Sequence, residues 1–313
     1  MTTPAQPTAE TSTRGAFVRQ PNAFTDRVTA DGSSGFPAEA GRYHLYVCYA
    51  CPWAHRAVIV RRLLGLEEVV GMTAVDPIRD ERGWRFTLEP DPVNGFAFLS
   101  EAYLATDPSF EGRYTVPALW DRETGRLVSN DYPVFTTMLE TEFAAFHAPG
   151  APDLYPEALR PEMDALAEEV FHDVNNGVYK AGFATSQEAY DEAVHALFAR
   201  LDVLEERLTT RRYLMGDQIT DVDVRLWTTL ARFDAVYVGH FRCDIRCLRE
   251  YPALWGYARD LHQTRGFGDT TDLDQIRRHY HCTHGELNPS RILPAGPLLD
   301  WHAPHGRERL GAG

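Results

Sequence analysis

The chain has 313 residues, of which 44% are apolar and 24% charged, and its formal net charge is −14. This length is sufficient for two modest domains with their own cores, and the composition is ordinary for a globular protein. The acidic charge, without any basic run, argues against nucleic acid or an anionic membrane as a partner. No apolar run approaches the ~20 residues that span a bilayer. No secretory signal opens the sequence either, so we expect a cytoplasmic protein.

The N-terminal forty residues carry little periodic pattern, which predicts an extended arm over residues 1–40. Three aromatic side chains are expected to pin this arm to the body of the protein: Phe17, Phe24 and Phe36.

The first regular element is a strand over Tyr43–Val47, indicated by alternating side chains. Cys51 and Pro52 follow, and an apolar-rich run over Pro52–Leu64 predicts a helix that Gly65 ends. Proline suits the first helical turn, so Cys51 is expected at or beside the helix N-cap.

Free N–H groups and the positive end of the helix dipole favour a thiolate at Cys51, and the thiolate is the nucleophilic form of cysteine. The sequence therefore indicates a reactive, redox-competent Cys51. The alternative is a small buried apolar residue, which is the usual environment of a free cysteine.

The other cysteines are Cys48, Cys243, Cys247 and Cys282. An odd, sparse set does not indicate a disulfide scaffold. Cys48 forms a Cys-x-x-Cys pair with Cys51, but it lies upstream on the strand, so we expect a buried, inert thiol; a resolving role is the alternative. Cys243 and Cys247 are four residues apart on a possible helix, yet no third ligand is evident, and no metal site is predicted.

The next segments complete a βαβ unit and a hairpin. A strand over Glu68–Val75 is expected to pair in parallel with the first, and the long connection Asp76–Arg113 is typical of a functional loop. A third strand begins with Thr115–Trp120, and Leu127–Ser129 forms the fourth after a turn over Asp121–Gly125.

The second half of the chain is helical in pattern. A helix over Val134–Phe146 is followed by a linker over residues 148–160, and apolar residues at helical spacing then continue over 161–285. Two helix N-caps are predicted there, at Ser186 and at the capping box that begins with Thr220. Residues 286–313 are rich in proline and glycine and are expected to form a tail on the surface.

Several motifs resemble those of the Xi-class glutathione transferases, the glutathionyl-hydroquinone reductases. The motifs are Cys-Pro-Trp-Ala-His-Arg over 51–56, Asn175–Ala184, Arg232–Phe241, and Arg278-His-Tyr280 followed by Asn288-Pro289. The resemblance extends from about Tyr43 to Pro297. It implies an α/β thioredoxin-like, thiol-binding domain over residues 41–147 and an all-α transferase domain over 161–285 that binds the aromatic substrate. It also implies a homodimer.

The resemblance further implies roles for individual residues. Cys51 is the catalytic cysteine, which attacks the sulfur of a thiol–hydroquinone conjugate and is left in a mixed disulfide that a second thiol molecule resolves. Trp84, Arg113 and Val116 are implied to bind the thiol, with the Val116–Pro117 peptide bond cis. Tyr179 and Tyr280 are implied to bind the aromatic ring. Arg113 and Arg56 are candidates to hold a carboxylate of the thiol. Judged alone, each of the two tyrosines is more typical of a core or rim position, and each of the two arginines of a solvated surface.

Asp131 and Tyr132 depart from the family pattern, which has a Glu-Ser pair that grips the γ-glutamyl end of glutathione. Asp131 can still bind an ammonium group, but Tyr132 replaces a small hydroxyl. Lys180 is the only lysine, which indicates a GC-rich genome of actinobacterial type. Both observations leave two thiols open, glutathione and mycothiol, since mycothiol has no γ-glutamyl end.

These residues suggest four functions, to different degrees. The leading hypothesis is a glutathione-dependent reductase of thiol–hydroquinone conjugates, and the second is the same chemistry with mycothiol. A conjugating transferase would normally use serine or tyrosine, so Cys51 argues against it. The fourth hypothesis is a non-catalytic binding protein that kept the transferase fold.

Overall fold

The computed structural model describes residues 10–87 and 90–311, so residues 1–9 of the predicted arm lie outside the described part. The described chain divides into two compact units. The first contains residues 21–152 and 274–285, and the second contains residues 10–20, 153–273 and the segment from 286 onward. This grouping differs from the predicted boundaries in two places: part of the arm belongs to the helical unit, and residues 274–285 belong to the unit with the sheet.

The first unit is built on a sheet of four strands in the order β2-β1-β3-β4. The strands are β1 (Tyr43–Val47), β2 (Gly71–Ala74), β3 (Ala118–Asp121) and β4 (Arg126–Ser129). β1 pairs with β2 in parallel, whereas the β1–β3 and β3–β4 pairs are antiparallel. The predicted βαβ unit and hairpin are therefore confirmed, with Gly125 at a positive φ of 64° in the hairpin turn.

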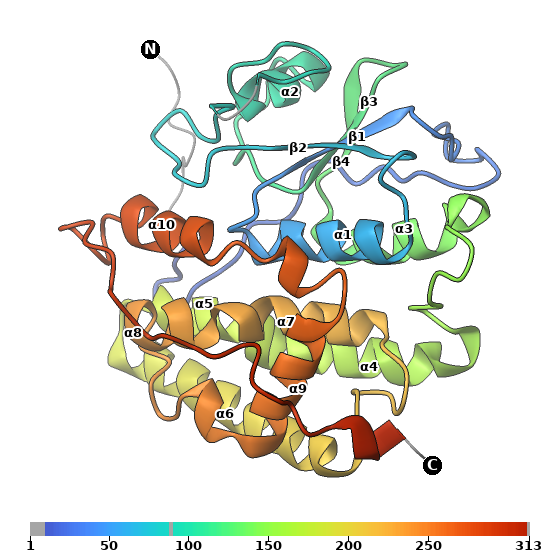
Figure 1. Ribbon diagram of the computed structural model, residues 1–313. Coiled ribbons are helices and arrows are strands. Elements are labelled where there is room, and N and C mark those ends of the chain that lie inside the picture. Colours follow the sequence, from blue (N-terminus) through green and yellow to red (C-terminus); the bar gives the residue numbers. More distant parts are fainter. Residues whose placement is uncertain (1–9, 88–89, 312–313) are drawn as a thin grey trace. The chain divides into compact units, whose positions relative to one another are not determined.

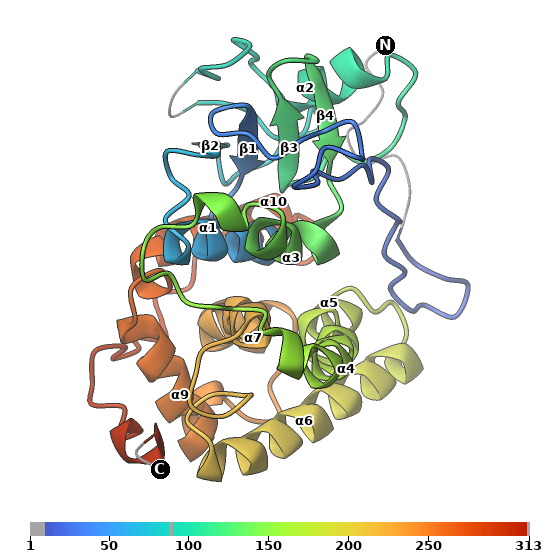
Figure 2. The ribbon, with the colours of Figure 1, turned by 90° about the vertical axis from the view of Figure 1, so that its right-hand side faces the viewer.

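The helices of this unit are α1 (Pro52–Leu63), α2 (Leu99–Thr106), α3 (Tyr132–Thr141) and α10 (Leu273–Thr283). α1 and α3 pack against each other and lie on one side of the sheet (Figure 2). α2 packs near β4 and was not predicted, because its eight residues follow an N-cap, Phe98, that has no capping hydroxyl or carboxylate. The Glu101 carboxylate instead accepts the N–H groups of Ala97 and Phe98.

Several predicted element bounds differ from the structure, among them the end of α3, which lies at Thr141 rather than Phe146. The second strand is shorter than Glu68–Val75, since residues 67–70 form a turn before β2 begins at Gly71. The third strand begins at Ala118 rather than Thr115, after the cis bond between Val116 and Pro117. α3 begins at Tyr132, because Pro133 is tolerated within the first turn of a helix.

The loop after β2 covers polar side chains of β1 and supplies a hydrogen-bond partner for one of them. The Tyr46 hydroxyl donates to Asp91 (2.9 Å), whose carboxylate also accepts backbone N–H groups of the loop, from Val93 and Asn94 among others. His44 is buried beside them, with Nε2 2.8 Å from the Thr73 hydroxyl oxygen. Asp91 therefore anchors its part of this loop to the sheet.

The second unit is helical (Figure 1). Its helices are α4 (Arg160–Val170), α5 (Gly177–Gly182), α6 (Gln187–Thr210), α7 (Asp221–Arg232), α8 (Val238–His240) and α9 (Pro252–Gln263). The structure confirms both predicted caps: the Ser186 hydroxyl accepts the N–H of Ala189, and the Thr220 box is formed with Asp223. Single π-helical turns follow α4 and α7, over Phe171–Asn175 and Phe233–Tyr237.

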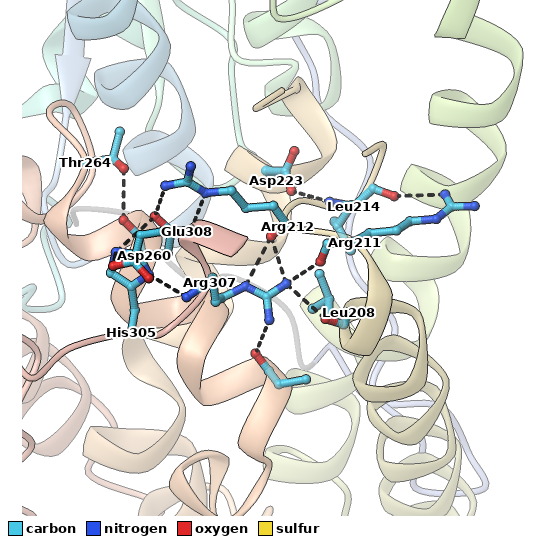
Figure 3. Close-up of polar contacts among 11 residues, drawn as sticks. Leu208, Arg211, Arg212, Leu214, Asp223, Asp260, Thr264, His305, Arg307 and Glu308 are labelled. Carbon is cyan, nitrogen blue, oxygen red and sulfur yellow. Dashed lines mark hydrogen bonds and ion pairs between the residues drawn. The ribbon is translucent and has the colours of Figure 1, made fainter. Parts of the chain in front are cut away.

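Short segments from both ends of the chain are fastened to this helical unit. Near the N-terminus, Phe17 is buried and stacks against Phe183, and Thr185 N–H donates to the Gly15 carbonyl (2.9 Å). Near the C-terminus, Trp301 is buried against other rings, and the Arg307 guanidinium donates to backbone carbonyls (Figure 3). Among the described residues, no helix is long and apolar enough to cross a membrane.

Candidate active site

Cys51 occupies the N-cap of α1, as predicted. Its backbone is extended, with φ −76° and ψ 120°, and its carbonyl accepts the N–H of His55 (3.0 Å), the first bond of the helix. Pro52 takes the first helical position, where no N–H is needed. The Cys51 side chain is partly exposed, whereas Cys48 is fully buried. Of these two thiols, Cys51 is therefore the one that a reagent can reach.

The thiol of Cys51 faces the start of β3. Its Sγ lies 3.5 Å from the Val116 carbonyl oxygen, a contact across 65 residues of sequence, and the peptide bond between Val116 and Pro117 is cis as implied by the resemblance. Cys51, predicted to be reactive, and the predicted thiol-binding backbone of Val116 are therefore adjacent.

The strand directions explain why these residues meet. β4 is antiparallel to β3, and β3 is antiparallel to β1, so β4 and β1 point the same way. α1 and α3 consequently both begin at the same end of the sheet, with Cys51 and Asp131 as their N-caps. Helix N-termini favour negative charge, so this end of the sheet suits a thiolate and an anionic ligand.

Asp131 is held in place by the N-terminal arm. Asn22 Nδ2 donates to its Oδ1 (2.9 Å), and Arg27 lies 4.0 Å from its Oδ2. The Asp131 side chain remains 18% exposed, so its carboxylate is also accessible to a ligand.

Tyr132 is buried and its ring packs against Trp53, at 4.5 Å between centroids. The guanidinium of Arg56 lies 4.7 Å from the centroid of the same indole. Arg56 is 1% exposed, so the expectation of a solvated surface arginine was wrong. Tyr132 therefore fills space beside Trp53, two residues from Cys51, where the family pattern places a small hydroxyl.

Trp84 is 4% exposed and lies in the loop after β2. Its indole stacks on the ring of His279 from α10 (5.2 Å, 21° between planes) and contacts the Arg79 guanidinium at 5.1 Å. Sequence reasoning missed His279; the only signal was its place in the Arg278-His-Tyr280 motif. Arg113 is half-buried in the segment between α2 and β3.

The two predicted substrate tyrosines belong to different units. Tyr280 is 1% exposed and lies on α10 in the same unit as Cys51, with its ring 5.2 Å from that of His279. Tyr179, in the helical unit, is 9% exposed within an aromatic cluster. Its neighbours there are Phe17, Phe183, Tyr237 and Phe241, and the Arg19 guanidinium lies 4.9 Å from its ring.

Cys243 and Cys247 do not share a helix, so that expectation was wrong. Arg242 has a positive φ of 58°, which ends the preceding helical turn, and the next 3₁₀ turn starts only at Leu248. Burial raises the pKa of the Cys243 thiol far above its usual range. Cys243 is therefore unsuited to thiolate chemistry.

Comparison with known proteins decides the family. The model of the glutathione S-transferase N-terminal domain matches residues 50–142, and that of the C-terminal domain matches residues 187–260. The glutathionyl-hydroquinone reductase YqjG of Escherichia coli is 47% identical over 308 residues, covering 95% of this chain and 94% of that protein. The chain belongs to the Xi class of the glutathione transferase family.

Solved structures agree with this assignment. A glutathione transferase from Gordonia bronchialis superimposes with a TM-score of 0.90 at 52% identity, covering 92% of this chain and 91% of that one. The Xi-class transferase of Phanerochaete chrysosporium gives 0.87 at 43% identity, covering 90% and 98%. The E. coli protein has also been solved with glutathione bound, with a TM-score of 0.87. The predicted fold is thus confirmed, and this Xi-class chain is an enzyme of the transferase family.

Proposed function

We propose that this Xi-class enzyme is a cysteine-dependent reductase of thiol–hydroquinone conjugates that works through a mixed disulfide on Cys51. The observation that carries the proposal is the placement of Cys51: a partly exposed thiol at the N-cap of α1, 3.5 Å from the Val116 carbonyl. Two relatives at 47% and 43% identity are named glutathionyl-hydroquinone reductases, which supports the same reaction class here.

In the first step, the Cys51 thiolate attacks the sulfur of the aryl thioether. The S–S bond forms as the carbon–sulfur bond breaks, and the electron pair of that bond stays on the ring carbon, which takes up one proton. The hydroquinone leaves reduced and Cys51 is oxidised to the mixed disulfide. In the second step, a second thiol molecule attacks this disulfide, which releases the thiol dimer and regenerates Cys51 as a thiolate.

Glutathione is the thiol we favour, because the E. coli relative, which is 47% identical to this chain, has been solved with glutathione bound. In the proposal, Trp84, Arg113 and Val116 hold the thiol, and the Asp131 carboxylate binds its ammonium group. Tyr132 cannot replace the small hydroxyl of the family pattern, since its ring is packed on Trp53. That substitution keeps mycothiol as the second candidate.

The aromatic ring of the conjugate is assigned to Tyr179 and Tyr280, whose hydroxyls would orient it or donate the proton that the ring carbon needs. The proposal also includes a homodimer, as the resemblance implies, and a cytoplasmic location.

The decisive experiment compares wild type, Cys51→Ser and Cys48→Ala in turnover of glutathionyl and mycothiyl conjugates of one hydroquinone. Cys51→Ser should lose turnover while it keeps its fold by circular dichroism, and Cys48→Ala should retain turnover. Mass spectrometry of the wild-type protein after exposure to each conjugate should find one adduct on Cys51, whose mass identifies the thiol.

Turnover by Cys51→Ser would refute the proposal. A Cys51 that resists alkylation at neutral pH, together with no turnover of either conjugate, would instead favour a non-catalytic binding protein with the transferase fold.

A further inference from the structure

His279 joins the loop after β2 to α10. Its side chain is buried, at 7% exposed, and Nδ1 lies 2.6 Å from the carbonyl oxygen of Pro77. A carbonyl can only accept, so Nδ1 carries the proton in this bond. The same ring stacks on Trp84. One histidine therefore holds both the backbone of the loop and its indole.

Contacts at both ends of the loop segment that carries Trp84 leave its side chain little freedom. The backbone carbonyl of Trp84 accepts the N–H of Leu99 (2.9 Å), which fixes that end of the loop at the start of α2. At the other end, Arg79 N–H points to the hydroxyl of Thr283 on α10 (3.4 Å), and its guanidinium lies against the indole. The orientation of the Trp84 side chain is consequently set by α10.

The next residue of α10 is Tyr280, whose ring meets the His279 ring edge to face at 79° and 5.2 Å. Both rings also contact His284, each at 5.5 Å between centroids. Trp84, His279 and Tyr280 thus form a continuous series of ring contacts within one unit.

We infer that His279 is a positioning residue that fixes Trp84 for the thiol and couples it to Tyr280. This inference rests on the proposed function, in which Trp84 contacts the thiol and Tyr280 the aromatic ring. Displacing Trp84 from His279 should weaken binding of the thiol, because the indole then no longer lies where the bound thiol meets it.

Two substitutions separate the contacts of His279. His279→Asn keeps an N–H donor near the position of Nδ1 but removes the ring, whereas His279→Phe keeps a ring and removes the donor. The matched control is Arg278→Gln, on the same helix, because Arg278 is exposed and its side chain forms a surface ion pair with Asp274 at 3.6 Å.

Hydrogen exchange and kinetics provide independent readouts. We expect His279→Asn to speed amide exchange over residues 77–87 and to raise the KM for the thiol about tenfold with a much smaller change in kcat. His279→Phe should speed exchange near Pro77 but raise the KM less. Arg278→Gln should match wild type in both. In the Trp84→Phe background, His279→Asn should add less than about twofold, since the two side chains act together.

Equal exchange and equal thiol KM in His279→Asn and Arg278→Gln would overturn the inference. If the factors by which Trp84→Phe and His279→Asn raise the KM simply multiply in the double variant, the two side chains act independently, and the proposed link between them is wrong. If wild type turns over neither conjugate, the proposed function fails, and the exchange measurement alone then decides whether His279 positions the loop.

Discussion

Arg307 fastens the C-terminal tail to the helical unit, and its removal should be among the most destabilising single changes in that unit. Its guanidinium is 4% exposed and donates to the carbonyls of Leu208 (3.0 Å), Arg212 (2.9 Å), Ala253 (3.3 Å) and Arg211 (Figure 3). α6 ends at Thr210, so Arg307 supplies donors and positive charge where the last carbonyls of a helix lack partners.

The magnitude follows from these contacts. A buried acceptor that loses its donor lowers the free energy of unfolding by about 1–3 kcal/mol. Arg307→Gln should leave at least two buried carbonyls without a donor. Burial of the guanidinium partly offsets this gain in stability, because removing the charge from water is costly. The same desolvation lowers the pKa of Arg307. We therefore expect Arg307→Gln to lower the free energy of unfolding by about 3 kcal/mol. Arg307→Lys, which keeps the charge but reaches fewer carbonyls, should lose about 1–2 kcal/mol.

Urea unfolding followed by circular dichroism measures this loss, with thermal unfolding as a check; about 3 kcal/mol lowers Tm by roughly 6–12 °C in a unit of this size. Arg309→Gln is the control, because Arg309 is exposed in the same turn and its replacement should stay within about 0.5 kcal/mol of wild type. The reasoning is refuted if Arg307→Gln unfolds at the same urea concentration as Arg309→Gln.

Two further predictions concern packing and pH. Gly182→Ala would place its Cβ in steric overlap with the ring of buried Phe241 and should cost about 1–3 kcal/mol, whereas Gly239→Ala, with no atom within 4 Å, should be neutral or stabilising by calorimetry. Burial, with Arg122 nearby, lowers the pKa of His44 to about 4 from 6.5. The unfolded chain therefore binds a proton first as pH falls, so stability is complete above pH 6.5 and declines by up to about 3 kcal/mol toward pH 4. His44→Gln should flatten that decline in urea midpoints; an equally steep decline would contradict this assignment.

Local sequence signals were sufficient for several elements of both units. Alternation identified β1, proline at the first helical position placed Cys51 at the N-cap of α1, and the hydroxyls of Ser186 and Thr220 marked two further helix starts. Each of these features depends on residues a few positions apart, so pattern and structure coincide.

The features that sequence reasoning missed depend on contacts between distant segments. His279 meets Trp84 and Pro77 across about two hundred residues, and no periodicity predicts that a helix late in the chain returns to the sheet. The π-helical turns after α4 and α7 were also missed, because nothing in Phe171–Asn175 or Phe233–Tyr237 distinguishes them from ordinary helix. The burial of Arg56 against Trp53 likewise depends on packing rather than pattern.

The sheet explains how residues 131 and 132 can depart from the family pattern without disturbing Cys51. Both N-caps lie at the same end of the sheet, but each is held by its own strand: Cys51 follows β1, and Asp131 follows β4. The Cys51 thiol keeps its contact with the Val116 carbonyl, while the Tyr132 ring occupies the face of Trp53. In the proposed function, the nucleophile and the residues that hold the rest of the thiol therefore lie on separate strand–helix junctions, so we expect that the thiol used can change while the chemistry at sulfur stays the same.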